Sequence, residues 1–212
     1  MTSDSRPSYE DPAGTWNARF AGDEFRFGTA PNGWLERHAG LFTPGQKVLC
    51  VADGEGRNSV WLAECGLVVD AFDIADVGVA KARRLAASRG VQVSYAVSDS
   101  DSFAWQSGHY DAVVAIFIQF ANPAERERIF SGMIRALAPG GLLILQGYTP
   151  RQLEYRTGGP PFAEHLYTEA LLREHFAALD IVHLREHDEV VREGKGHSGM
   201  SALIDLVAQK RA

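Results

Sequence analysis

Short apolar runs alternate with amphipathic segments through the middle of this chain. The apolar runs predict strands at Val48–Val51, Val68–Phe72, Val91–Val97, Tyr110–Phe117 and Leu142–Gln146. The segments between them predict helices at Asn58–Glu64, Val77–Ser88 and Pro123–Leu137. Tyr110–Phe117 is apolar on both faces, as is typical of a central strand in a parallel sheet. This alternation predicts a parallel sheet with helices on both faces.

The two ends of the chain have other patterns. We expect residues 1–10, which are polar, to be a disordered tail, and residues 11–212 to form one domain. An N-terminal helical cap over about 11–42 would contain helices at Pro12–Phe20 and Pro31–Leu41. After a helix at Thr168–His175, the strands Leu179–Val191 and Ser201–Lys210 follow one another across a glycine-rich link, Arg192–Gly199. Without a crossover helix they must pair antiparallel, so a Rossmann-like, mostly parallel α/β sheet with a C-terminal antiparallel hairpin is predicted.

Candidate chemistry lies where the first two strands end. Gly54 and Gly56 form a tight turn after the first strand, and Asp73 ends the second. Glycine lets a backbone approach a ligand closely, and an acid at that point accepts hydrogen bonds from ribose hydroxyls, which indicates a nucleoside site. The same glycines could serve only the geometry of an ordinary β–α turn.

The details of the turn bear on the ligand. A dinucleotide site has a third glycine, and this chain has Ser59 in its place. Asp53 and Glu55 in the turn would repel a pyrophosphate, but they suit a ligand with an ammonium or sulfonium charge. S-adenosylmethionine is such a ligand.

Composition narrows the partners. The chain of 212 residues has a formal net charge of −6, which argues against a nucleic-acid surface held by bulk positive charge. Cys50 and Cys65 are too few for a disulfide framework, and no Cys/His spacing matches a zinc site, so we expect no metal. No apolar stretch is long enough to cross a membrane, which leads us to expect a cytoplasmic protein without a membrane partner. The oligomeric state stays open.

Taken in order, several segments resemble the class I S-adenosylmethionine-dependent methyltransferases. Within them the chain looks most similar to the small bacterial group related to the tellurite-resistance methyltransferase. The segments are Trp16–Phe20, Phe27–Asn32, Asp53–Asn58, Ala71–Ile74, Tyr110–Val114, Leu137–Leu142, Thr157–Pro160 and Glu193–Leu203. One departure concerns the acid that often binds the methionine amino group, because Cys50 and Ala52 stand at that acid and at the family's first glycine. Asp53, Glu55 or backbone carbonyls would have to take its place.

The resemblance implies a cofactor site for S-adenosylmethionine, with S-adenosylhomocysteine as product. Its residues would be Trp16, Arg19, Asp53, Gly54, Gly56, Asn58, Asp73, Ile74, Asp99, Ser100, Ile116 and Phe117. Asp73 would bind the ribose, Ile74 would lie against the adenine, and Asp99 with Ser100 would meet the adenine edge, although Asp99 could equally be a turn residue.

Further residues are candidates for the methyl acceptor. We expect Gln119, Tyr148, Arg151 and Tyr155 to contact substrate, because they follow the fourth and fifth strands. His197, in the glycine-rich link, is the best candidate for a general base. Possible binders of an anionic substrate are Arg57, Arg151 and Arg156.

These observations favour an S-adenosylmethionine-dependent methyltransferase acting on a small molecule, such as a thiol, a chalcogen oxyanion or another soft nucleophile. An NAD(P)-dependent oxidoreductase is one alternative, but it explains neither the missing third glycine nor the hairpin. A non-catalytic S-adenosylmethionine-binding protein is another. A protein or nucleic-acid methyltransferase would need a basic or aromatic docking surface, which this acidic chain does not show.

Overall fold

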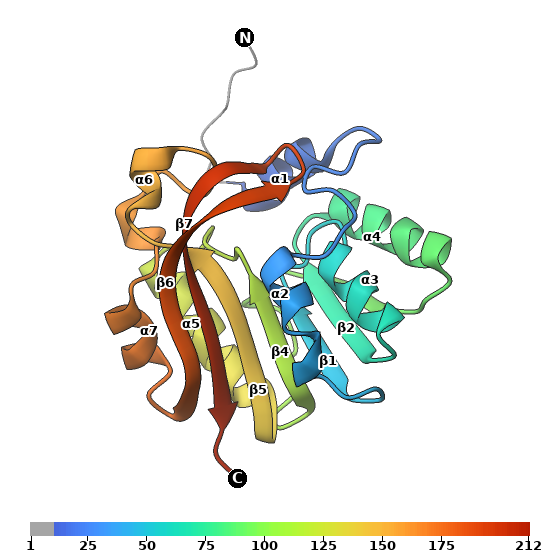
Figure 1. The fold of residues 1–212 in the computed structure, drawn as a ribbon. Coiled ribbons are helices and arrows are strands. Elements are labelled where there is room, and N and C mark those ends of the chain that lie inside the picture. Colours follow the sequence, from blue (N-terminus) through green and yellow to red (C-terminus); the bar gives the residue numbers. More distant parts are fainter. Residues whose placement is uncertain (1–10) are drawn as a thin grey trace.

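A mixed seven-stranded sheet organises the molecule (Figure 1). The computed structural model describes residues 11–212, so the expectation for residues 1–10 lies outside the described residues. The strand order is β3-β2-β1-β4-β5-β7-β6. The strands are β1 (Lys47–Val51), β2 (Val68–Asp73), β3 (Ser94–Val97), β4 (Tyr110–Ile116), β5 (Leu137–Tyr148), β6 (Leu179–Glu193) and β7 (His197–Lys210). Strands β1 to β5 pair in parallel and β7 pairs antiparallel with both β5 and β6, which confirms the predicted fold class.

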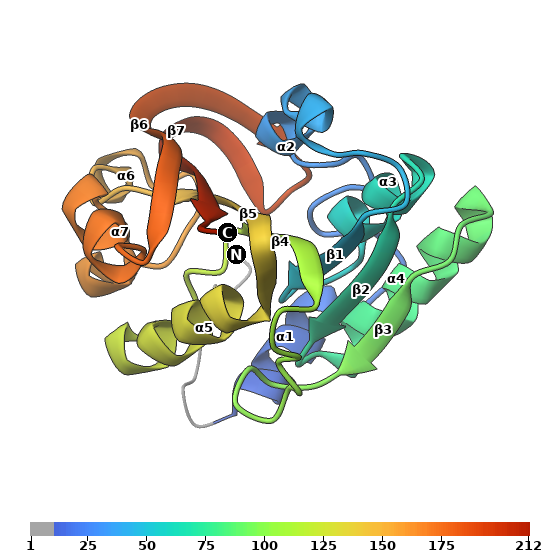
Figure 2. The ribbon, with the colours of Figure 1, turned by 90° about the horizontal axis from the view of Figure 1, so that it is seen from below.

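Helices cover both faces of this sheet (Figure 2). They are α1 (Pro12–Phe20), α2 (Gly33–Arg37), α3 (Arg57–Glu64), α4 (Asp76–Arg89), α5 (Pro123–Ala136), α6 (Gln152–Tyr155) and α7 (Glu169–His175), with short 3₁₀ turns at Ala39–Leu41 and Ala163–His165. Helices α2, α3 and α4 lie on one face, and α5 and α7 lie on the other. The largest buried cluster packs α5 and α7 against the sheet, and the second packs α2 and α3 against its opposite face.

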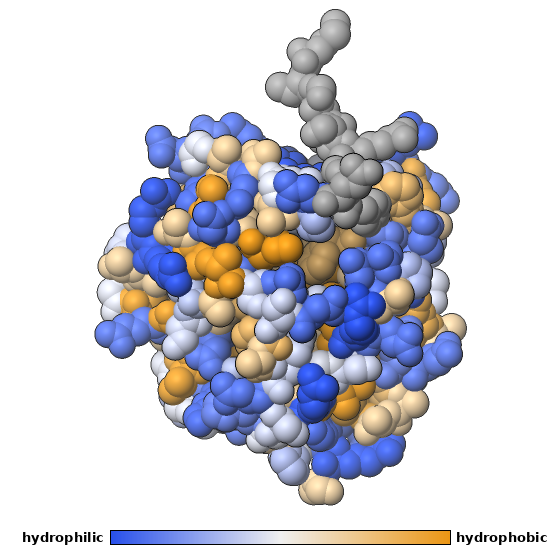
Figure 3. All heavy atoms as spheres, turned by 180° about the vertical axis from the view of Figure 1, so that it is seen from behind, coloured by the Kyte–Doolittle hydropathy of each residue, from blue (hydrophilic) through white to orange (hydrophobic). Residues whose placement is uncertain are grey.

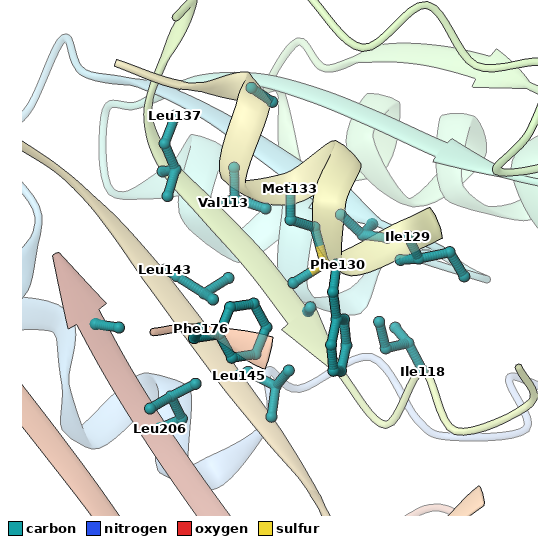
Figure 4. Packing of buried hydrophobic residues seen from close by; sticks show 14 of the residues in the cluster. Val113, Ile118, Ile129, Phe130, Met133, Leu137, Leu143, Leu145, Phe176 and Leu206 are labelled. Atoms are coloured by element: carbon teal, nitrogen blue, oxygen red, sulfur yellow. The ribbon is translucent and has the colours of Figure 1, made fainter. Parts of the chain in front are cut away.

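Helix α5 shows how the sequence builds one of these layers. Asn122 and Glu125 form a reciprocal capping box at its start, and Pro123 occupies the first helical position, where no N–H is needed. Ile129, Phe130 and Met133 then fall on one face and pack against the sheet (Figure 4). This contact covers β4 and β5 with a packed apolar layer.

The C-terminal hairpin is longer than its sequence pattern predicts. Strands β6 and β7 stay paired up to Glu193 and His197, so the expectation of a glycine-rich link over Arg192–Gly199 is wrong. Backbone hydrogen bonds continue the ladder even where the side chains are charged, because pairing does not depend on them. The turn itself docks on the N-terminal segment, since the N–H groups of Lys195 and Gly196 donate to the carbonyl of Arg26.

Two smaller expectations also differ from the structure. The single helix expected over Pro31–Leu41 begins only at Gly33, because Asn32 caps α2 through the N–H of Leu35. It ends at Arg37, and a separate 3₁₀ turn follows at Ala39–Leu41. Strand β5 begins at Leu137 instead of Leu142, so Pro139–Gly141 lies within it, next to a register shift against β4.

The surface seen in Figure 3 intersperses hydrophilic residues with smaller apolar groups. The most exposed large apolar side chains are spread over several strands: Val68, Val97, Val182, Val190 and Met200. Val190 and Met200 are partners across β6 and β7, and small apolar groups of this kind are ordinary on a protein surface. Within residues 11–212, no helix combines the length and the apolar content needed to cross a bilayer.

Candidate functional site

A cavity of about 400 Å³ lies at the carboxyl ends of β1, β2 and β4, beneath α1. This is where parallel sheets place their ligands. Its lining includes Trp16 and Phe20 of α1, the turn after β1, the end of β2, the loop after β3, the end of β4, and His197 at the start of β7. The lining thus combines residues that lie up to 185 positions apart, from Pro12 to His197.

The cavity brings together most of the residues expected there from the sequence. Those that line it are Trp16, Asp53, Gly54, Asn58, Asp73, Ile74, Asp99, Ser100, Ile116, Phe117 and His197. Those outside the lining are Arg19, Gly56, Gln119, Tyr148, Arg151 and Tyr155. Position alone does not test a role in binding, so all of these roles stay predictions.

The residues outside the lining have structural partners. The side-chain amide of Gln119 is buried and bonds both the N–H and the carbonyl of Tyr148. Arg151 and Tyr155 both contact Asp188 at the surface, the first at 2.7 Å and the second at 2.9 Å. The Arg19 guanidinium lies 4.9 Å from the centre of the Trp16 ring. These contacts position neighbouring segments of the site.

The turn after β1 is tied to the end of β2. The N–H of Gly54 donates to Asp73 Oδ2 at 2.8 Å, and the N–H of Ala75 donates to Asp73 Oδ1 at 2.8 Å. Gly54 has a φ of 61°, and a Cβ there would lie 3.2 Å from the Phe20 ring of α1. Ala52 and Phe117 also adopt left-handed φ values, 49° and 56°, which non-glycine residues seldom do outside functional sites.

The two acids of the turn have different environments. Glu55 points away from the cavity and forms an ion pair with the buried Lys81 at 2.5 Å, while its other oxygen accepts from the N–H of Arg26. Asp53 lines the cavity and accepts from the Ser59 hydroxyl. Burial raises the pKa of Asp53 to about 7, with Asp73 adding to the effect and Ser59 opposing it. Burial likewise raises the pKa of Asp73 to about 6 against its backbone hydrogen bonds.

The His197 end of the cavity is aromatic. The His197 ring lies 4.5 Å from that of Phe27 and 4.4 Å from that of Phe117, with Tyr148 at 5.7 Å. Burial lowers the pKa of His197, an effect that Glu193 opposes and Arg57 reinforces. The imidazole is therefore neutral near pH 7 and able to accept a proton.

A buried carboxylate holds this end together. Glu193 Oε2 accepts from Arg57 Nη2 at 2.6 Å, and its Oε1 accepts from Asn32 Nδ2 at 2.9 Å and from the Gly33 N–H at 3.0 Å. Burial would raise the pKa of Glu193, but His197, Arg57 and Gly33 together hold it near 2. Arg57 also lines the cavity, and its second terminal nitrogen, Nη1, is buried without a hydrogen bond inside residues 11–212.

Sequence reasoning missed Phe20, Phe27, Asn32 and Glu193 as parts of the site. Phe20 and Phe27 line the cavity, and Asn32 and Glu193 lie behind it. The segments that hold Phe27 and Glu193 do carry part of the family resemblance. Their meeting depends on docking of the hairpin turn onto Arg26, a contact between distant segments that no local pattern reports.

Comparison with known proteins gives a consistent class. Residues 48–141 match a family model described as a methyltransferase domain. The chain is 34% identical over 107 residues to demethylmenaquinone methyltransferase of Thermus thermophilus, which covers 50% of this chain and 48% of that enzyme. It is 32% identical over 173 residues to thiopurine S-methyltransferase of Azotobacter vinelandii, covering 70% of this chain and 75% of that enzyme. The chain spans about half the length of the first three curated relatives it matches.

Solved structures share the fold. TehB from Haemophilus influenzae superposes with a TM-score of 0.71 at 21% identity, over 86% of this chain and 63% of that one. NodS from Bradyrhizobium japonicum in complex with S-adenosylhomocysteine gives 0.70 at 16% identity, over 94% and 98%. A structure from work on "conversion of a disulfide bond into a thioacetal group during echinomycin biosynthesis" gives 0.75 at 18% identity, over 94% and 91%.

The chain belongs to the class I S-adenosylmethionine-dependent methyltransferases, and S-adenosylmethionine is its cofactor. The site fits this cofactor, because Gly54, which has no side chain to keep a ligand away, and the Asp73 carboxylate lie together at one wall of the cavity. Membership in this family argues against the alternative of an NAD(P)-dependent oxidoreductase. The narrower tellurite-resistance group stays a prediction, because likeness to TehB at this identity shows the fold alone.

Proposed function

We propose that this chain transfers a methyl group from S-adenosylmethionine to a small molecule with a soft nucleophile, such as a thiol or a chalcogen oxyanion. The observation that carries the proposal is the cavity itself. Asp73, an acid of the kind that binds ribose, lies at the end of one strand, and His197 with the rings of Phe27 and Phe117 forms an aromatic end. The names of the Azotobacter relative and of the echinomycin-related structure both concern sulfur chemistry and support a sulfur acceptor. We also propose that residues 11–212 act as one domain, with residues 11–42 as a cap over the cofactor.

The residues of the chain would divide the work between binding and proton transfer. Bound S-adenosylmethionine supplies an activated methyl group. Asp73 and the Gly54 backbone would hold the nucleoside, and Trp16 and Phe20 of α1 would exclude water. The neutral His197 imidazole would take the proton from a thiol acceptor, and Arg57 Nη1 would stabilise the resulting anion.

The proposal is tested by calorimetric titration with S-adenosylhomocysteine and S-adenosylmethionine, with NAD and NADP as controls. We expect micromolar binding of the adenosyl ligands only. Asp73→Ala should weaken it about 10-fold to 100-fold, which corresponds to the loss of charged hydrogen bonds. Product formation with thiols, selenite and tellurite then tests the acceptor class. A well-folded protein that binds neither adenosyl ligand contradicts the proposal, and binding without turnover of any acceptor favours the non-catalytic alternative.

A further inference from the structure

The cavity carries more acid than base. Its lining contains five acidic residues, Asp53, Asp73, Asp99, Asp101 and Glu125, and, within the described part of the chain, Arg57 as its permanently charged cation. The Arg57 guanidinium is already paired with Glu193, which lies behind the cavity. A ligand that brings positive charge would therefore complete the electrostatics of the site.

Three of these acids are satisfied by the protein. Asp101 forms an ion pair with Arg128 at 2.7 Å, Glu125 belongs to the capping box of α5, and Asp99 accepts from the N–H groups of the turn that follows it. Asp73 accepts from two backbone N–H groups. Asp53 lies in the turn after β1 and accepts from the neutral Ser59 hydroxyl, whereas Asp101 has a cation as its partner.

The surroundings of Asp53 offer it little countercharge, because Arg57, the cation that faces it, is already paired with Glu193. The groups that face it are the Cys50 thiol from β1, the Asp73 carboxylate from β2, Ser59 and Arg57 from α3, and the Tyr95 hydroxyl from β3, which bonds Ser59 at 2.9 Å. No ion pair joins Asp53 to any of residues 11–212, and the one nearby cation, Arg57, donates to Glu193. A carboxylate deep in protein without a cation favours its protonated form.

Glu55, the other acid of the turn, cannot serve as the unpaired acid, because it already has a cation as its partner. Glu55 is held by Lys81, which also donates to the carbonyls of Phe20 and Glu24. Cys50 stands where the family's motif often has an acid, and its buried thiol carries no charge, since burial raises its pKa well above the ordinary value. Asp53 is thus the unpaired acid of the turn that lines the cavity.

We propose that Asp53 shares a proton in the free protein and releases it when the cofactor binds, so that its carboxylate becomes the counter-ion of the ammonium group on the cofactor's methionine part. The proposal rests on the cofactor assignment and adds to it a coupling between cofactor binding and pH. The proton passes from the Asp53 carboxyl to solvent, and no covalent bond to the cofactor forms or breaks. Affinity for the cofactor therefore rises as the pH rises through neutrality.

Two ligands and two pH values test this proposal by calorimetry. S-adenosylhomocysteine carries the ammonium group, and 5′-methylthioadenosine shares the nucleoside but lacks it. Between pH 6 and pH 8 we expect the affinity for S-adenosylhomocysteine to rise about tenfold. In buffers of different ionisation enthalpy, binding should release about one proton per site at pH 6 and close to none at pH 8. The affinity for 5′-methylthioadenosine should change about twofold or less.

Variants separate Asp53 from the rest of the site. Asp53→Asn should bind S-adenosylhomocysteine about tenfold more weakly than the wild type at pH 8, without pH dependence, and should bind 5′-methylthioadenosine like the wild type, which also proves that it folds. Asp180→Asn, the same change at an exposed residue paired with Arg211, should behave like the wild type. Binding of both ligands without a pH effect, or unchanged binding by Asp53→Asn, overturns this proposal alone. Failure of both ligands to bind wild type at any pH overturns the proposed function as well.

Discussion

At the scale of single residues, Gly56 decides how closely α4 approaches the turn after β1. It precedes α3 in the left-handed region, with a φ of 89°. A Cβ built on it would lie 2.6 Å from the Ala82 Cβ of α4 and 2.9 Å from the Tyr95 hydroxyl. Gly56 therefore contributes to the cavity from outside its lining, through the packing of α4 against the turn.

Gly45 supplies a matched comparison for Gly56. It has nearly the same φ, 88°, but no atom lies within 4 Å of a Cβ placed there. We expect Gly45→Ala to lower the free energy of unfolding by about 1 to 2 kcal/mol through backbone strain alone. Gly56→Ala should lower it by about 1 to 3 kcal/mol more, because crowding adds to the strain. Urea unfolding measures both, and equal losses would show that the Ala82 contact yields without cost.

Residues differ in how far the sequence reveals them. Gly54, Asp53 and Asp73 could be predicted as neighbours, because consecutive parallel strands bring their ends to one edge of the sheet. Phe27 and Glu193 could not, since their place depends on how two distant segments dock. Glu55 shows the limit of charge reasoning: it lies in the turn as expected, but Lys81, 26 residues further on, removes it from the cavity.

At the scale of elements, the turn between β6 and β7 and the segment before α2 are joined beside the His197 end of the cavity, and this junction is called the clamp here. Glu193 joins them by accepting from Asn32, Gly33 and Arg57, and Asn32 in turn bonds Gln146 on β5 at 2.7 Å. Strand β7 carries His197 into the cavity from this clamp. The hairpin itself could be predicted from two consecutive strand patterns, but its length and docking could not.

Glu193→Gln tests the clamp. The change leaves the Arg57 guanidinium buried without a charged partner, so we expect the free energy of unfolding to fall by about 3 to 5 kcal/mol. Glu189→Gln, on the same strand, removes an exposed ion pair with Arg37 and should cost about 1 kcal/mol or less. Chemical denaturation of the two variants gives the comparison. If both variants lose a similar, small amount of unfolding free energy, Arg57 has found another partner and Glu193 is not what joins these segments.

At the scale of the whole molecule, the acids of the cavity make the stability of the free protein depend on pH. The folded-state pKa values of Asp53 and Asp73, about 7 and about 6, lie above the ordinary value of 3.8. The stability that their protons supply is complete below pH 3.8 and is lost as the pH rises through 6 and 7. His197 acts in the opposite sense below its ordinary pKa of 6.5, because its folded-state pKa is lowered. Above pH 6.5, the change of stability with pH therefore comes mainly from Asp53, with the smallest contributions from Asp73 and His197.

Thermal unfolding between pH 6.5 and pH 8 measures how much stability the free protein loses when Asp53 ionises without a cation beside it. Between pH 6.5 and pH 8, the free wild type should lose about 0.8 kcal/mol relative to Asp53→Asn, or about 2 to 3 °C in Tm, because a pKa near 7 titrates there. Saturating S-adenosylhomocysteine should stabilise the wild type increasingly as the pH rises, and Asp53→Asn by a constant amount. Parallel pH profiles for the free wild type and the variant would show that Asp53 is ionised throughout. In that case Asp53 holds no proton for the cofactor to displace, and cofactor affinity is not coupled to pH through this residue.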